Sequence, residues 1–153
     1  MQKSKISTTT TFTFLLVLGT LISITPNFLQ TSLAQQVSTD LTAPTGGNLQ
    51  GGDKKGNLEM SVQNGTVIAT AEMDVPPAND QVYEGWLEDK GDASGYSLSL
   101  GKFNQDDILS VNQTMVNPYT YTVFYVTAEP VDDPDPSPAG VVAGAQLDSP
   151  FGQ

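Results

Sequence analysis

Acidic residues crowd two short segments that have the ligand chemistry of a calcium site. Asp132, Asp133 and Asp135 share one proline-containing segment, and Asp106 and Asp107 share another. Calcium takes six to eight oxygen ligands, which carboxylates supply. Neither segment has the alternating aspartates, the following glycine and the distal glutamate of a calcium-binding loop. We therefore interpret both as solvated acidic turns and expect no metal site there.

The chain has no histidine and no cysteine. These absences exclude a Ser-His-Asp triad, a thiolate nucleophile and the usual protein ligands of zinc and copper. Met60, Met73 and Met115 are consequently expected to fill a core rather than to bind copper. Paired carboxylates are the one hydrolytic option left, and no acidic pair stands out in the sequence. We expect no catalytic residue and no cofactor.

Two asparagines begin the triplet that is recognised for N-glycosylation. The triplets are Asn64-Gly65-Thr66 and Asn112-Gln113-Thr114. Both asparagines are candidate glycosylation sites. The alternative is a chance match, which is common in chains rich in Asn and Thr.

The longest strand signal is Tyr119–Pro130, which reads YTYTVFYVTAEP. Its β-branched and aromatic residues predict a strand, and a period of two places Tyr119, Tyr121 and Tyr125 on one face. Tyrosine suits a half-exposed surface that meets a partner. This tyrosine stripe is therefore a candidate interaction surface. The alternative is that a hairpin predicted at residues 57–72 covers it.

Further strands are predicted by short alternating runs between turn residues. Asn64-Gly65 joins two apolar runs, which is a strong hairpin signal. No segment has helical periodicity. We expect an all-β domain of about seven strands, built as a single antiparallel β-sandwich (Ig-like), with an antiparallel barrel as the alternative. The remaining predicted strands are 81–88, 96–103, 108–115 and 140–147.

Three aromatic residues, Tyr83, Trp86 and Phe124, are the expected core anchors because large rings contribute most to apolar burial. Tyr83 and Trp86 are three residues apart, so a regular strand would place them on opposite faces. A β-bulge at Gly85 would turn both rings inward.

The amino-terminal residues follow the three-part plan of a secretory signal peptide. Lys3 and Lys5 give a basic start, Phe12–Ile24 is a short apolar run, and Ala34 ends a segment of small residues before a cleavage point. We expect residues 1–34 to be removed. The alternative is an uncleaved membrane anchor, for which the apolar run is short.

The rest of the chain divides by composition. Residues 35–56 are rich in Gly, Thr and Asn and are predicted to be a flexible linker. Residues 57–147 are predicted to form the β-sandwich, and residues 148–153 a tail.

The formal net charge is −11, and all six basic residues are lysines. Such a field repels nucleic acids and anionic lipid surfaces, so neither is an expected partner. An acidic, cysteine-free exported domain suits the outer face of a prokaryotic cell. Its natural counterpart is an unknown envelope protein with a basic surface.

Four short motifs follow one another in the chain: Tyr83–Leu87, Ser99–Phe103, Val126–Pro130 and the Pro136–Val142 segment. Taken in this order, they resemble the C-terminal, extracytoplasmic domain of anti-sigma-K factors of the RskA type. The resemblance covers residues 57–147 and implies a sensory or interaction domain without catalytic residues. The chain lacks the sigma-binding region of that family, so no direct sigma factor binding is expected.

Taken together, these observations predict a non-catalytic exported interaction or sensory module of the cell envelope. A structural component of the cell surface is the first alternative. A hydrolase that uses carboxylates alone is the second alternative.

Overall fold

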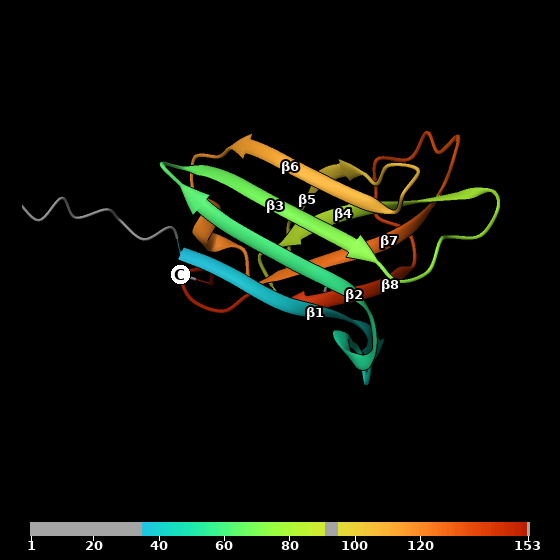
Figure 1. Cartoon of the computed structure of the whole chain (residues 1–153), viewed down its shortest axis with the longest axis horizontal. Coiled ribbons are helices and arrows are strands. Elements are labelled where there is room, and N and C mark those ends of the chain that lie inside the picture. The colour runs from blue at the N-terminus through green and yellow to red at the C-terminus, as the bar shows by residue number, and fades with distance from the viewer. Residues whose placement is uncertain (1–34, 91–94, 153) are drawn as a thin grey trace, which may run out of the picture. The chain divides into compact units, whose positions relative to one another are not determined.

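The computed structural model describes residues 35–90 and 95–152 of the chain. These residues form eight strands and one short 3-10 helix, η1, at Pro118–Thr120 (Figure 1). The strands are β1 (Gln35–Thr45), β2 (Asn48–Gln63), β3 (Thr66–Met73), β4 (Gln81–Glu88), β5 (Ser97–Lys102), β6 (Ile108–Thr114), β7 (Val123–Pro130) and β8 (Val141–Gln146).

All eight strands belong to one antiparallel sheet with the order β5-β4-β7-β8-β1-β2-β3-β6. The sheet curls until its edge strands, β5 and β6, approach each other, so the barrel is nearly closed. In Figure 1, β1, β2, β3 and β6 form the near wall and the other four strands the far wall. The all-β, antiparallel prediction is confirmed, whereas two separate Ig-like sheets are not, because hydrogen-bonded pairing runs through all strands.

The β2–β3 hairpin forms where the sequence predicts it. Asn64 and Gly65 occupy the turn with φ of 52° and 77°, values that Asn and Gly tolerate best. The strand that follows, β3, alternates strictly, with Val67, Ala69 and Ala71 buried and the residues between them facing outward. This alternation fixes the register of one wall of the barrel.

The prediction of a flexible linker at residues 35–56 is wrong. This segment forms β1 and the first half of β2, which pair from Gln35 to Thr45. Gly46 and Gly47, both at positive φ, make the two-residue turn between them. The segment looks polar because every buried apolar side chain (Val37, Leu41 and Leu49) is separated from the next by several small or polar residues.

The strand predicted at Tyr119–Pro130 begins later, at Val123. Pro118 starts η1, and the Asn117 side chain accepts a hydrogen bond from the Tyr119 backbone N–H. A proline is favoured at the start of a helical turn because it has no N–H to satisfy. The polypeptide therefore turns once before it enters β7.

The predicted tail is also packed against the domain. Phe151 is 4% exposed, and its ring centroid lies 6.2 Å from that of Tyr119. The Gly152 backbone N–H donates to the Tyr121 carbonyl at 2.9 Å. Residues 148–152 thus close one end of the barrel.

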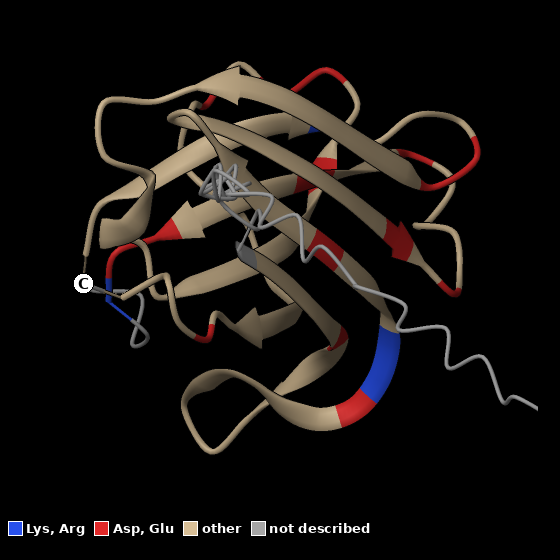
Figure 2. Cartoon of the chain, turned by 60° about the vertical axis from the view of Figure 1, so that its left-hand side comes forward, with Lys and Arg blue, Asp and Glu red and all other residues tan. Residues whose placement is uncertain are grey.

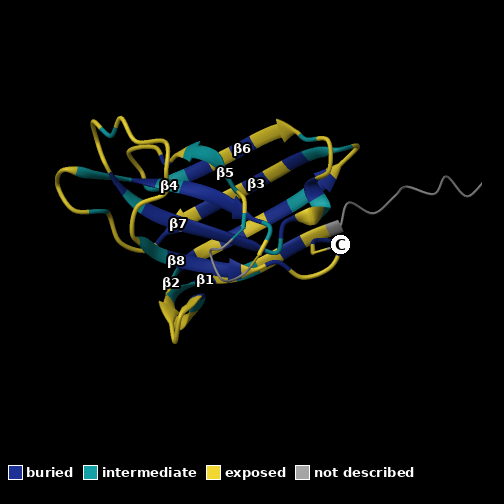
Figure 3. Cartoon of the chain, turned by 180° about the vertical axis from the view of Figure 1, so that it is seen from behind, coloured by how far each residue is buried: buried dark blue, intermediate teal, exposed yellow. Residues whose placement is uncertain are grey.

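Two apolar clusters lie on the two sides of β4 and β7. Tyr83 and Phe124 belong to the main core inside the barrel, whereas Trp86 and Tyr125 belong to a smaller cluster on the outer side, under Leu49. Figure 3 shows β7 almost uniformly buried and β4 buried along its second half, while β6 alternates. All three predicted core anchors are buried.

The predicted bulge at Gly85 does not bring Tyr83 and Trp86 to one face. β4 pairs regularly with β7, and the register shift lies in β5, between Ser99 and Gly101. Gly85 has another role: a Cβ there would lie 2.4 Å from Leu109 Cδ2. Its lack of a side chain lets Leu109 of β6 reach across the interior to β4.

The predicted signal peptide, residues 1–34, lies outside the described residues. Within the described part of the chain, no helix has the length and apolar character needed to cross a bilayer.

Candidate ligand-binding groove

A groove of about 610 Å³ opens at the end of the barrel where β3 leads into β4 and β5 into β6. This volume falls in the range of small-molecule binding sites. Apolar and polar side chains share its wall. The lining residues are Pro76, Pro77, Ala78, Gln81, Val82, Tyr83, Lys102, Phe103, Asn104, Gln105, Asp107 and Val131.

Backbone hydrogen bonds tie the walls of the groove to one another. Val131 N–H donates to the Asp80 carbonyl at 3.1 Å, which joins the end of β7 to the β3–β4 loop. Met73 N–H donates to the Asp107 carbonyl at 3.1 Å and holds the β5–β6 turn against β3. The Asn104 side chain accepts from two backbone N–H groups of that same turn. The groove is therefore built before any ligand arrives.

Tyr83 and Phe103 form the aromatic floor. Their ring centroids lie 5.9 Å apart in an edge-to-face arrangement, which suits aromatic pairs. The Tyr83 hydroxyl donates to the Val75 carbonyl at 3.1 Å, so its polar end is already satisfied. Burial raises the pKa of Tyr83, and the negative charge of Asp107 raises it further. The negative charge of Asp107 thus acts on Tyr83 at the floor of the groove.

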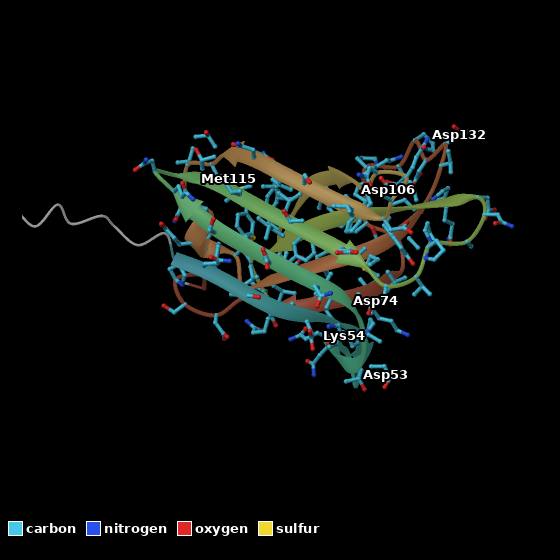
Figure 4. All side chains as sticks on the ribbon, viewed as in Figure 1. Asp53, Lys54, Asp74, Asp106, Met115 and Asp132 are labelled. Atoms are coloured by element: carbon cyan, nitrogen blue, oxygen red, sulfur yellow. The ribbon has the colours of Figure 1, made fainter. Side chains whose placement is uncertain are left out.

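Acidic residues are frequent in the three connections at the groove end of the barrel, and one of them, Asp107, lines the groove. Figure 2 shows red acidic segments in several loops and strand ends, and few blue lysine segments. Seven of the 17 acidic residues lie in the three connections at this end of the barrel, and Figure 4 places Asp74, Asp106 and Asp132 there, far from Met115. The other four acids in these connections are Asp80, Asp107, Asp133 and Asp135.

Lys102 is the only cation that lines the groove in the part of the chain that the structure describes. Its Nζ lies 3.5 Å from the Val131 carbonyl oxygen. Lys54, by comparison, pairs with Asp40 at 2.9 Å, and that hydrogen bond raises the pKa of the Lys54 ammonium. Negative charge therefore dominates the rim of the groove.

A buried polar network positions the loop that begins at Val131. Trp86 Nε1 donates to Thr127 Oγ1 at 2.8 Å, and the Thr127 hydroxyl donates to Glu129 Oε1. That same carboxylate oxygen accepts from Ala139 N–H at 2.9 Å, on the far side of the loop. Glu129 is 2% exposed, and its Oε2 atom has no hydrogen-bond partner among the described residues.

A second network on the same face holds another connection. Glu88 is fully buried; its carboxylate accepts from Gly95 N–H at 2.8 Å and from the Ser97 hydroxyl at 2.5 Å. Tyr125 in turn donates to Ser97 Oγ at 2.8 Å and stacks on Trp86. Both buried carboxylates thus fasten loops to the barrel. Sequence reasoning did not identify these two glutamates. The only sequence signal is that glutamate alternates with Trp or Thr along β4 and β7, and this alternation does not predict a buried carboxylate.

The structure does not gather the tyrosine stripe on one exposed face. Tyr119 lies in η1, half-buried against Phe151. Tyr121 and Tyr125 are 9% and 2% exposed and belong to opposite sides of the sheet. Burial is the first cause of the raised pKa of both phenols. These residues act as packing groups rather than as an exposed interaction surface.

The two candidate glycosylation sites are exposed. Asn64 stands at the tip of the β2–β3 hairpin and Asn112 on the outer face of β6. The threonines of the two triplets face each other, with their hydroxyl oxygens 3.1 Å apart. Whether the asparagines carry glycans stays a prediction.

The acidic turns use their carboxylates on their own backbone. Asp133 accepts from Asp135 N–H, and Asp135 accepts from Ser137 N–H. Across residues 35–90 and 95–152, no group of three or more carboxylates is arranged to hold a metal ion. Met60 and Met73 lie in the main core and Met115 packs against it, as expected.

No protein-family model, curated protein or solved structure matches the chain. The four motifs that resemble the outer domain of anti-sigma-K factors lie on β4, β5, β7 and the loop into β8, which are consecutive neighbours in the sheet. Membership of that family remains a prediction.

Proposed function

We propose that the protein is a non-catalytic, exported interaction module and that the groove at the end of the barrel is its binding site. The observation that carries this proposal is the groove itself, with an aromatic floor, hydrogen-bonded walls and a volume of about 610 Å³. Interface energy concentrates in a few aromatic or arginine contacts that fill well-packed pockets.

The chemistry of the surrounding side chains supports binding rather than bond breaking. The chain has neither histidine nor cysteine. The two most buried carboxylates, Glu88 and Glu129, accept hydrogen bonds from loop backbone and lie away from solvent. A nucleophile or general base needs access to its substrate, and neither carboxylate has it.

The envelope setting of this proposal comes from the amino-terminal residues and from the resemblance. Residues 1–34 have the pattern of an export signal. Tyr83, Lys102 and Phe103 of the resembling motifs line the groove, and Val131 follows the third motif directly. We take an envelope protein with a basic surface as the partner.

Site-specific photo-cross-linking on intact cells tests the proposal. A photoreactive amino acid replaces Val131, which is 55% exposed in the groove, and in a matched variant it replaces Val116, which is fully exposed outside the groove. We expect a defined adduct with one identified envelope protein from position 131 and none from position 116. Equal labelling from both positions, or none from either, would rule out the groove as the binding site.

A further inference from the structure

We propose that the groove takes an extended polypeptide segment in which an arginine or lysine stands next to an apolar side chain. This inference rests on the proposed function and names the partner chemistry of the same site. It combines two independent properties of the groove, its apolar floor and the sign of the charge around it.

The floor requires an apolar anchor. Tyr83 and Phe103 meet edge to face, and Val131 and Pro77 extend the apolar wall toward the surface. Tyr83 and Phe103 are only 6% and 5% exposed, so the apolar surface that a ligand can reach is chiefly that of the exposed side chains of Val131 and Pro76. A purely charged ligand would leave this surface without a partner.

The rim requires a cation. Asp107 lines the groove, and six further acidic residues lie in the three connections at this end of the barrel. Lys102, the one basic lining residue of the described chain, has its ammonium group beside the Val131 carbonyl. Carboxylates around a partly desolvated groove attract a positive group and disfavour an anion.

Arginine meets both requirements at once. Its guanidinium pairs with carboxylates through two parallel hydrogen bonds, and its methylene groups pack along apolar side chains. A polypeptide is the source to which we commit, because the groove lies open between three loops and the acidic residues spread along all three. Acidic residues distributed in this way can pair with basic residues of a bound polypeptide both inside the groove and outside it.

Binding of capped synthetic peptides to the protein as cells release it tests this inference. The probe alternates two arginines with two leucines. One control peptide replaces both arginines with citrulline, which keeps the shape and removes the charge, and another replaces both leucines with serine. We expect each control to bind at least about tenfold more weakly than the probe, a difference of about 1.4 kcal/mol. Raising the salt concentration should weaken binding of the arginine probe and leave binding of the citrulline peptide unchanged.

Two pairs of variants locate the effect. Asp107→Asn removes one charge from the groove, and asparagine tolerates the φ of 58° at this position. Asp148→Asn removes the same charge at the other end of the barrel. Val131→Ser shortens the apolar wall, and Val116→Ser is its exposed match. In each pair, we expect the variant in the groove to weaken binding of the probe at least about threefold more than its control variant does.

The outcomes separate the two proposals. If cross-linking from position 131 captures the partner but citrulline binds as well as arginine, the groove is the site and the basic-segment inference is wrong. If the probe binds but Asp107→Asn and Asp148→Asn weaken it equally, attraction is a property of net charge and the inference is also overturned. No measurable binding of the arginine probe, at low or high salt, likewise overturns it. If position 131 captures nothing, the proposed function itself fails.

Discussion

The indole of Trp86 donates a hydrogen bond of 2.8 Å to the hydroxyl of Thr127, across the β4–β7 pair. The Thr127 hydroxyl donates in turn to the Glu129 carboxylate, which also accepts from the Ala139 N–H at the end of the next loop. That loop starts at Val131, in the wall of the groove. The stability of the sheet and the shape of the groove therefore depend on one chain of hydrogen bonds.

Replacing Thr127 with valine tests this chain. Valine keeps the shape and the β-branch, but it leaves the buried indole N–H without an acceptor and removes one donor from Glu129. An unsatisfied buried polar group costs about 1–3 kcal/mol. We expect a loss of this size in the free energy of unfolding, measured by chemical denaturation, and faster hydrogen exchange at the Ala139 amide.

Thr70→Val is the matched control, because Thr70 is exposed on β3 and the substitution is the same. Its effect should stay within about 0.5 kcal/mol. Equal losses for the two variants would show that the Trp86–Thr127 bond contributes nothing specific.

The second prediction concerns the close contact between Gly85 and Leu109 in the interior of the barrel. Gly85→Ala would place a methyl group 2.4 Å from Leu109 Cδ2 and 3.2 Å from Phe124 Cζ. Overpacking of this kind costs about 1–3 kcal/mol. Gly140→Ala should be nearly neutral, because no atom lies within 4 Å of its added Cβ.

A double-mutant cycle makes the test specific. Leu109→Ala alone should cost about 2–5 kcal/mol by leaving a cavity. In that background Gly85→Ala has room, so it should cost clearly less than in the native protein. Additivity within about 0.5 kcal/mol would mean that the two residues do not contact each other.

Local signals in the sequence predict much of this fold. Asn64-Gly65 fixes a hairpin because both residues accept positive φ. Strand positions between turns follow from alternation, as in β3, and the burial of Tyr83, Trp86 and Phe124 follows from their size. These features depend on neighbours in the chain, which is why they can be read without the structure.

Other features depend on partners far along the chain. β1 has few large apolar residues and looks like a linker, yet the strand forms because β2 turns back along its whole length. Tyr125 is buried in an outer cluster that includes Trp86 of β4 and Leu49 of β2. The groove joins residues from three separate connections, and no local pattern relates Phe103 to Val131. These are tertiary contacts, so they cannot be predicted from composition or from the periodicity of apolar residues.

Alkaline titration gives a third prediction. Burial raises the pKa of Tyr83, Tyr121 and Tyr125 above the ordinary value of about 10. The folded state then holds these protons more tightly than the unfolded state, so the stability they contribute is fully present below pH of about 10 and is lost as pH rises through the raised values. Phenolate absorbance should show part of the five tyrosines titrating late in native protein and all of them near 10 in denaturant. Coincident native and denatured titration curves would contradict the burial of these phenols.

The last prediction tests whether the segment before residue 57 is part of the domain. Leu41 is fully buried in the main core, and Leu49 covers Trp86 on the outer side of the sheet. Leu41→Ala should therefore cost about 2–5 kcal/mol. Val116→Ala, at a fully exposed apolar position, should cost less than about 0.5 kcal/mol. A chain that starts at Asn57 loses β1, half of β2 and three buried apolar side chains, each worth about 1.5–3 kcal/mol. Because a domain of this size has only about 5–15 kcal/mol of stability, the shortened chain should be unfolded by circular dichroism while a chain that starts at Gln35 is folded. If the shortened chain melts like the longer one and Leu41→Ala is silent, residues 35–56 are a linker after all.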